Sequence, residues 1–144
     1  MLRKTRFFFL AMTGLLAWQS ALAMAESDLY VVTTADFETG STALMRAGSQ
    51  VPQIDLLAPI HGDALARYHG GMIYIIERFL GDNIIVLNTA DLRTPVVQFS
   101  VGNGANPQDI EFFGADKAYV SRYGSTALLV VDPRAGSQLG EIDL

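Results

Sequence analysis

The sequence contains no cysteine, and this absence excludes two features that exported proteins often use. No disulfide can form, so the burial of apolar side chains must stabilise the fold alone. No lipid anchor can be attached through a cysteine. The amino-terminal region also lacks an Arg-Arg pair, so it carries no twin-arginine export signal.

Catalytic motifs are scarce as well. No serine lies in a G-x-S-x-G element, so a hydrolase triad has little support. Residues 102–107, GNGANP, lack the third glycine of a phosphate loop, and Pro107 leads into a predicted strand where such a loop needs a helix. This stretch is therefore expected to be a turn, and no cofactor is predicted.

Only two histidines are present, and they do not suggest a shared metal site. His61 and His69 fall at opposite ends of one predicted strand, roughly 20 Å apart at about 3.3 Å per residue. A zinc ion with bonds of about 2 Å cannot reach both side chains. A site that uses His61 with Asp63 stays open as an alternative, but the sequence predicts no metal site.

Basic residues are few once the amino terminus is set aside. Arg3, Lys4 and Arg6 precede an apolar run over residues 7–18 and small residues at 21–25, the pattern of a secretory signal peptide cleaved after Ala23 or Ala25. The run is too short to span a bilayer, although an uncleaved anchor is an alternative. We therefore expect a signal peptide over residues 1–25, a periplasmic, secreted or cell-surface location, and no stable membrane insertion after cleavage.

The expected mature chain, residues 26–144, is acidic. It keeps all 15 acidic residues and loses three of the ten basic ones, so its formal charge falls from −5 to −8. A surface of that sign disfavours phosphate backbones and anionic lipids. We expect no nucleic-acid partner.

A repeated unit organises the mature chain. Residues 106–144 contain four short apolar runs at 108–113, 117–122, 127–132 and 138–144, separated by turn residues. The same pattern occurs at 64–69, 72–78, 83–88 and 95–101. Arg78 and Arg122 lie 44 residues apart, as do Tyr30 and Tyr74. A four-strand unit with a period of about 44 residues is typical of β-propeller blades.

A third copy, less similar and incomplete, precedes these two. Its predicted strands are residues 29–34, 41–46 and 50–55, and it lacks an innermost strand. The expected fold is all-β: a propeller of four-stranded antiparallel blades over residues 28–60, 63–101 and 106–144, about 2.75 blades. Because closed propellers usually need at least four blades, we expect an amino-terminal fragment of a longer protein. The runs at 72–76, 84–87 and 127–131 are continuously apolar, which favours sheets that are covered on both faces.

Three segments resemble the YVTN family of bacterial β-propeller repeats: GMIYIIERFLGDNIIVLN, VGNGANPQDI and KAYVSRYGSTALLVVDP. In that family a Tyr-Val strand precedes a Val-Ile-Asp strand, and the next repeat opens with a Val-Gly…Pro turn. The resemblance covers about residues 29–144. It departs at Glu77-Arg78 and Ser121-Arg122, where the family motif has Thr-Asn. It implies the propeller fold and often an exported location, but no single activity.

One face of the predicted sheets collects the candidate binding residues. In an antiparallel meander, the turns after the second and fourth strands lie at the same end, and binding residues of repeat scaffolds cluster on one rim. Asp63 with Arg78 and Asp109 with Arg122 recur at matching points and are predicted to pair, and this recurrence favours a structural role. Turn formation is the alternative role for the whole set. The candidate ligand-binding residues are His61, Asp63, Arg78, Asp82, Asn106, Gln108, Asp109, Arg122 and Tyr123.

These observations leave three functional hypotheses. The first is an exported propeller scaffold that binds an unknown ligand or protein partner through the loops of one face, with no catalytic residue assigned. The second follows from the resemblance alone and is a propeller enzyme, either a lactonase-like hydrolase or a redox protein. The third is a cell-surface structural or adhesion protein. The uncovered edges and faces of a partial propeller also predict that the chain joins further blades or associates with itself.

Overall fold

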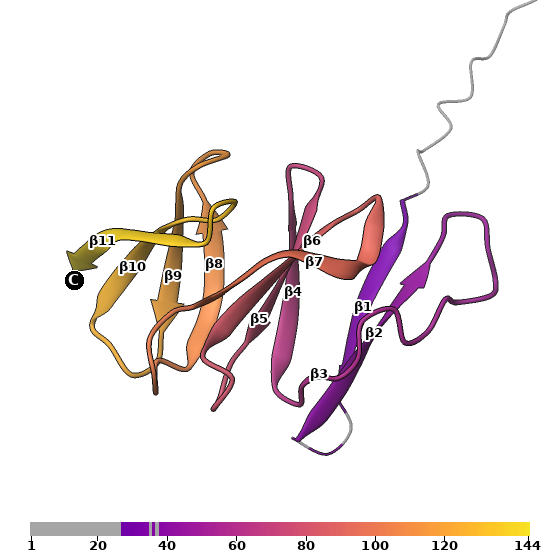
Figure 1. Cartoon of the computed structure of the whole chain (residues 1–144), viewed down its shortest axis with the longest axis horizontal. Helices are drawn as coiled ribbons and strands as arrows, with labels where there is room; N and C mark the ends of the chain where they lie inside the picture. Colours follow the sequence, from indigo (N-terminus) through magenta and orange to yellow (C-terminus); the bar gives the residue numbers. More distant parts are fainter. Residues whose placement is uncertain (1–26, 35, 37) are drawn as a thin grey trace, which may run out of the picture.

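The computed structural model describes residues 27–34, 36 and 38–144 as an all-β chain of three antiparallel sheets. The sheets lie side by side in chain order (Figure 1). The predicted signal peptide lies outside the described residues. Within the part of the chain that is described, no helix is long and apolar enough to cross a membrane.

Each sheet is formed by strands that follow one another in the sequence. The first sheet contains β1 (Leu29–Thr34), β2 (Thr39–Met45) and β3 (Ile60–His61). The middle sheet contains β4 (Ala64–His69), β5 (Met72–Glu77), β6 (Asn83–Asn88) and β7 (Asp91–Ser100). The third sheet contains β8 (Pro107–Phe112), β9 (Ala118–Arg122), β10 (Ala127–Asp132) and β11 (Ser137–Asp143).

The all-β prediction is confirmed, and β1, β4, β6 and β10 have the predicted bounds. The prediction was wrong for the third strand of the first copy. Residues 50–55 form only an isolated bridge between Gln53 and Leu44, and the strand is β3 instead. Pro52 has no N–H to donate, and Asp55 has a φ of 51°, so a regular ladder cannot run through this segment.

Two apolar cores lie between the three sheets. In the middle sheet, side chains alternate between the two faces, as in any strand. Ile73, Ile75, Ile85 and Leu87 pack in the first core, against the first sheet. Tyr74, Ile76, Ile84 and Val86 pack in the second core, against the third sheet. The continuous apolar runs are thus explained by burial on both faces, as the sequence predicted.

The three sheets repeat one arrangement, but the first sheet is incomplete. The strand β5 packs against β8 of the following sheet, and β1 packs against β4 of its following sheet. The strand β1 therefore corresponds to β5, the second strand of the middle sheet. Among the described residues, no strand of the first sheet takes the position that β4 and β8 occupy in theirs.

Candidate functional site

Several connections meet at one end of the three sheets, the lower end in Figure 1. We call this the loop end and define it by residues 62–63, 78–82, 101–106 and 123–126. Of the predicted site residues, Asp63, Arg78, Asp82, Asn106 and Tyr123 lie in or beside these connections. The prediction that these turns gather at one end is consistent with this arrangement.

Asp63 and Arg78 form the ion pair that the sequence predicted. The Arg78 Nε–H donates to Asp63 Oδ1 at 2.9 Å, and the backbone amide of Phe79 donates to Asp63 Oδ2 at 3.3 Å. The Arg78 amide also donates to the Asp63 carbonyl at 2.7 Å. Asp63 therefore holds the start of the β5–β6 turn through both its side chain and its backbone.

Asp82 holds the end of the same turn to the connection between the middle and third sheets. Its two carboxylate oxygens accept the Gly104 amide at 2.6 Å and the Asn106 amide at 2.7 Å. The Val101 amide donates to the Asp82 carbonyl at 3.0 Å. Both oxygens are therefore engaged in fixing backbone, which makes Asp82 a structural residue of the loop end.

The predicted pair of Asp109 with Arg122 was wrong. Asp109 accepts two hydrogen bonds from Arg67 on β4, Nε to Oδ1 and Nη2 to Oδ2, both at 2.9 Å. Burial would raise the pKa of the Asp109 carboxyl, but the hydrogen bonds from Arg67 and from the Ile110 amide outweigh it, and the pKa is lowered. Arg122 bonds Glu141 on β11 at 2.6 Å instead.

A one-residue slip in the repeat explains the error. The Tyr123 amide donates to the Asn106 carbonyl at 3.0 Å, the same bond that the Arg78 amide makes to Asp63 in the middle sheet. Tyr123, and not Arg122, therefore corresponds to Arg78. A slip of one residue moves a strand's side chains to the other face of the sheet. The ladder between β8 and β9 is also irregular between Pro107 and Asp109, which a fixed period cannot reveal.

His61 and Gln108 are tied to neighbouring groups. The His61 amide donates to Glu77 Oε1 at 2.7 Å, and its ring Nδ1 accepts the Asp63 amide at 3.1 Å. The Gln108 side-chain amide donates to the Asn106 carbonyl at 2.9 Å. Within the described residues, no three histidine or acidic side chains are grouped closely enough to hold a metal ion.

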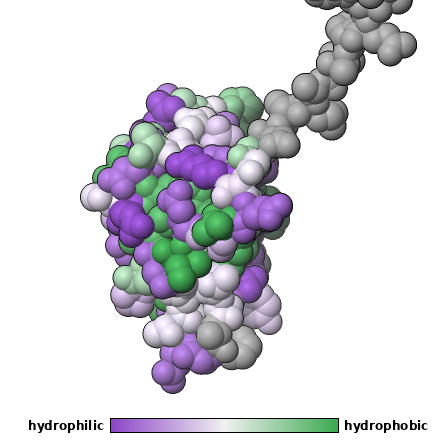
Figure 2. All heavy atoms as spheres, turned by 90° about the vertical axis from the view of Figure 1, so that its right-hand side faces the viewer, coloured by the Kyte–Doolittle hydropathy of each residue, from purple (hydrophilic) through white to green (hydrophobic). Residues whose placement is uncertain are grey.

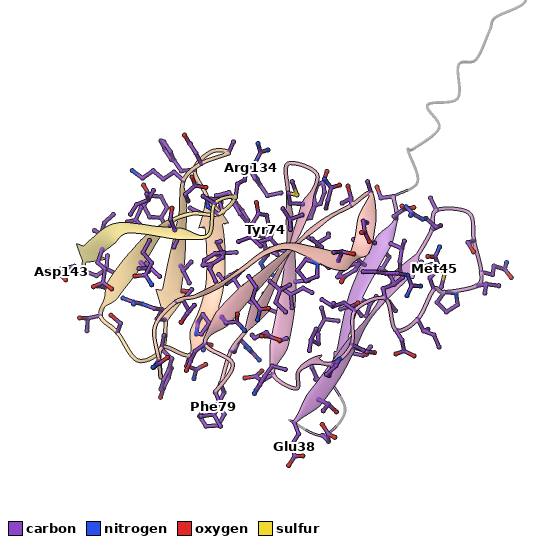
Figure 3. The ribbon with its side chains drawn as sticks, in the orientation of Figure 1. Glu38, Met45, Tyr74, Phe79, Arg134 and Asp143 are labelled. Carbon is purple, nitrogen blue, oxygen red and sulfur yellow. The ribbon has the colours of Figure 1, made fainter. Side chains whose placement is uncertain are left out.

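The structure adds apolar residues that sequence reasoning missed. Phe79 and Leu80 are 57% and 73% exposed at the loop end, where the predicted Tyr123 is 82% exposed, and Phe79 points away from the sheets (Figure 3). Leu80 has a φ of 63°, in the left-handed region that a bulky residue rarely adopts. The sequence did contain a signal for this exposed tip. Phe79 and Leu80 are two bulky apolar residues inside a turn, whereas turns usually carry glycine, proline and small polar residues.

A cleft of about 700 Å³ lies between the first and middle sheets. Tyr30, Leu44, Ile73 and Leu92 are among its apolar and aromatic lining, and Arg67 and the ion-paired Asp28 and Arg46 also line it. The buried Tyr30 hydroxyl has no hydrogen-bond partner among the described residues, and burial raises its pKa. None of the predicted site residues lines this cleft.

No protein-family model matches the sequence, and no curated protein matches it either.

Proposed function

We propose that the three sheets are consecutive blades of an exported β-propeller of the YVTN type, and that the chain is a binding scaffold. The equivalence of β1 and β5 supports the repeat, since each packs on the first strand of the following sheet, and β9 has the place of β5 in the third sheet. Apolar cores on both sides of the middle sheet support blade-like stacking. In this proposal β4 and β8 are innermost strands, and the Arg67–Asp109 pair joins them.

The function that we propose is the binding of a protein partner through the loop end. One observation carries it: the turn over residues 78–82 presents Phe79 and Leu80 to solvent while carboxylates hold it at both sides. A bulky residue kept at positive φ and exposed is costly for the free protein. Such a cost is explained if the side chain is needed for contact with a partner.

A protein partner fits this surface better than a small polar ligand. Asp63, Asp82 and Arg78 use their side-chain groups to hold the turn, so they are not free to orient a small molecule. Exposed aromatic side chains such as Phe79 and Tyr123 are instead enriched at protein interfaces, where they supply much of the binding energy. The carboxylates therefore position the turn, and the apolar side chains make the contact.

Photo-crosslinking tests this proposal in the cells that produce the protein. A photoreactive phenylalanine analogue replaces Phe79 in one variant and Phe113 in the other. Phe113 is the matched control because it is also an exposed phenylalanine, 78% accessible, in the β8–β9 turn at the opposite end. We expect an adduct with a protein other than this chain from position 79 and no such adduct from position 113.

Two further variants sharpen the test. Leu80→Ala should reduce the yield of the position-79 adduct several-fold, because it removes contact area and leaves the carboxylate contacts in place. Tyr123→Ala should reduce it as well if the whole loop end takes part. The absence of an adduct at position 79, or equal adducts at positions 79 and 113, would contradict the proposal.

A further inference from the structure

Two sheet faces at opposite sides of the molecule have no further sheet packed on them among the described residues. The first sheet turns Tyr30, Val32 and Leu44 toward the first core, so the residues between them lie on its other face. That outer face carries Leu29, Val31, Ala43 and Met45, with Leu29 paired to Met45 and Val31 to Ala43. Figure 2 views this side and shows an apolar patch that is surrounded by polar residues.

The outer face of the third sheet is apolar at its centre, and Glu111 and Lys117 lie beside Tyr119. Its inner face turns Ala118, Val120, Leu129 and Val131 toward the second core. Tyr119, Leu128 and Val130 alternate with these residues, and Ile142 pairs with Leu128, so all four lie on the outer face. Ile142 is 43% exposed, whereas Val130, on a strand with a neighbour on each side, is 7% exposed.

The contact between the middle and third sheets shows what each outer face fits. In that contact, Tyr74 and its neighbours on β5 and β6 pack against the inner face of the next sheet. Tyr119 holds the same place in the third sheet, since Tyr119 pairs with Val130 as Tyr74 pairs with Val86. The outer face of the third sheet therefore corresponds to the face that the middle sheet turns toward the sheet that follows it. We call this the forward face.

The outer face of the first sheet corresponds to the face that the middle sheet turns toward the sheet that precedes it. We call this the backward face. Tyr30 pairs with Leu44 as Tyr74 pairs with Val86, so Leu29 and Val31 hold the places of Ile73 and Ile75. Ile73 and Ile75 pack against the preceding sheet. The chain therefore carries one forward face and one backward face of a contact that it already makes twice within itself.

We propose that copies of this chain associate head to tail, with the outer face of the third sheet of one copy packed on the outer face of the first sheet of the next. The backward face offers only uncharged side chains on β1 and β2: Leu29, Val31, Thr33, Ser41, Ala43 and Met45. No charge has to be buried there, and burying two apolar faces is favourable. The two surfaces differ, so the interface is heterologous: it closes into a ring or grows into a longer array.

Two substitutions test each face separately in the full chain. Leu29→Lys places a charge on the backward face, and Ile142→Lys places one on the forward face. Val96→Lys is the control, because Val96 is 57% exposed on β7 of the middle sheet and so lies on neither outer face. Sedimentation velocity over a range of concentrations measures association, and the far-ultraviolet circular dichroism spectrum checks that each variant is folded.

Mixing the two variants gives the decisive result. Each single variant should be monomeric, while the natural chain and the control associate. The Leu29→Lys variant keeps an intact forward face and the Ile142→Lys variant an intact backward face, so an equimolar mixture should form a one-to-one dimer. A monomeric natural chain would overturn the proposal. So would association that persists in either single variant, because face-to-same-face pairing would then explain it.

Discussion

Glu77 and Arg122 hold equivalent positions in neighbouring sheets, and each binds a backbone group that precedes its own sheet, Glu77 an amide of β3 and Arg122 a carbonyl after β7. The buried Glu77 carboxylate accepts the backbone amide of His61 at 2.7 Å. The Arg122 guanidinium donates to the backbone carbonyl of Val101 at 3.4 Å. One contact therefore recurs along the chain while its charge is reversed. The backbone group that faces each side chain determines which charge fits.

Replacing Glu77 tests this contact. Glu77→Ala should lower the free energy of unfolding by about 1–3 kcal/mol, because the His61 amide and the Asn83 side-chain amide lose their acceptor at a buried site. Urea denaturation measures the change. Glu111→Ala, at an exposed position of β8, should change stability by less than about 0.5 kcal/mol. Equal losses for the two variants would contradict the role given to Glu77.

Asp82 offers a second test, at the connection between the middle and third sheets. Asp82→Ala removes the acceptor for two backbone amides and places alanine at a φ of 51°, so we expect a loss of about 2–3 kcal/mol. Asp82→Asn should lose less, because asparagine tolerates this φ and keeps one acceptor oxygen. Asp116→Ala, in the exposed β8–β9 turn, is the control. Thermal unfolding that fails to separate Asp82→Ala from this control would count against the assignment.

The Arg67–Asp109 pair predicts a dependence on pH. The pKa of Asp109 is lowered in the folded state, so its contribution is present above the unfolded value of about 3.9 and is lost as the pH falls through the folded value. Asp109→Asn should therefore be less stable than the natural chain at pH 7, by about 0.2–1 kcal/mol for so exposed a pair. The difference should shrink as the pH is lowered from 7 toward 2. A difference that is constant across this range would show that the ionised carboxylate is not its source.

Leu80 should be a residue whose replacement does not harm the fold. Leu80→Gly relieves the left-handed backbone at a side chain that is 73% exposed, so stability should stay the same or rise by up to about 1 kcal/mol. The gain is limited because glycine loses more conformational freedom on folding. Leu87→Ala, in the first core, should instead cost about 2–5 kcal/mol. Calorimetric unfolding of both variants checks this contrast.

The strands were predictable from the sequence because the apolar runs and the turn residues agree with each other. β6 is bounded by Asp82 on one side and by Thr89-Ala90 on the other, and every residue of its apolar run is buried. The start of β7 was missed. Leu92 is buried in the first core, and two register shifts between β6 and β7 let this strand begin at Asp91, inside the predicted turn. The amino-acid composition of a strand does not predict such register shifts.

The candidate site was predicted only in part, because a polar residue in a turn can equally face solvent or hold backbone. Asp63 and Arg78 were paired correctly, because they are 15 residues apart in the sequence and lie at the two ends of one hairpin. The partner of Asp109, Arg67, is 42 residues away on another sheet, and only the stacking of the sheets reveals it. The exposed tip of Phe79 and Leu80 was missed because large apolar side chains are usually buried.

The burial of the middle sheet on both faces also determines how the molecule should open. β5 and β6 are enclosed by both cores, whereas every residue of β11 is exposed. Backbone amides of β5 and β6 should therefore exchange with deuterium only when the whole structure unfolds, and amides of β11 should exchange through local fraying. β1 has strand neighbours on one edge only and should fall between these extremes. The chain should thus open from its two outer sheets inward, with the centre of the sequence the last part to lose its protection.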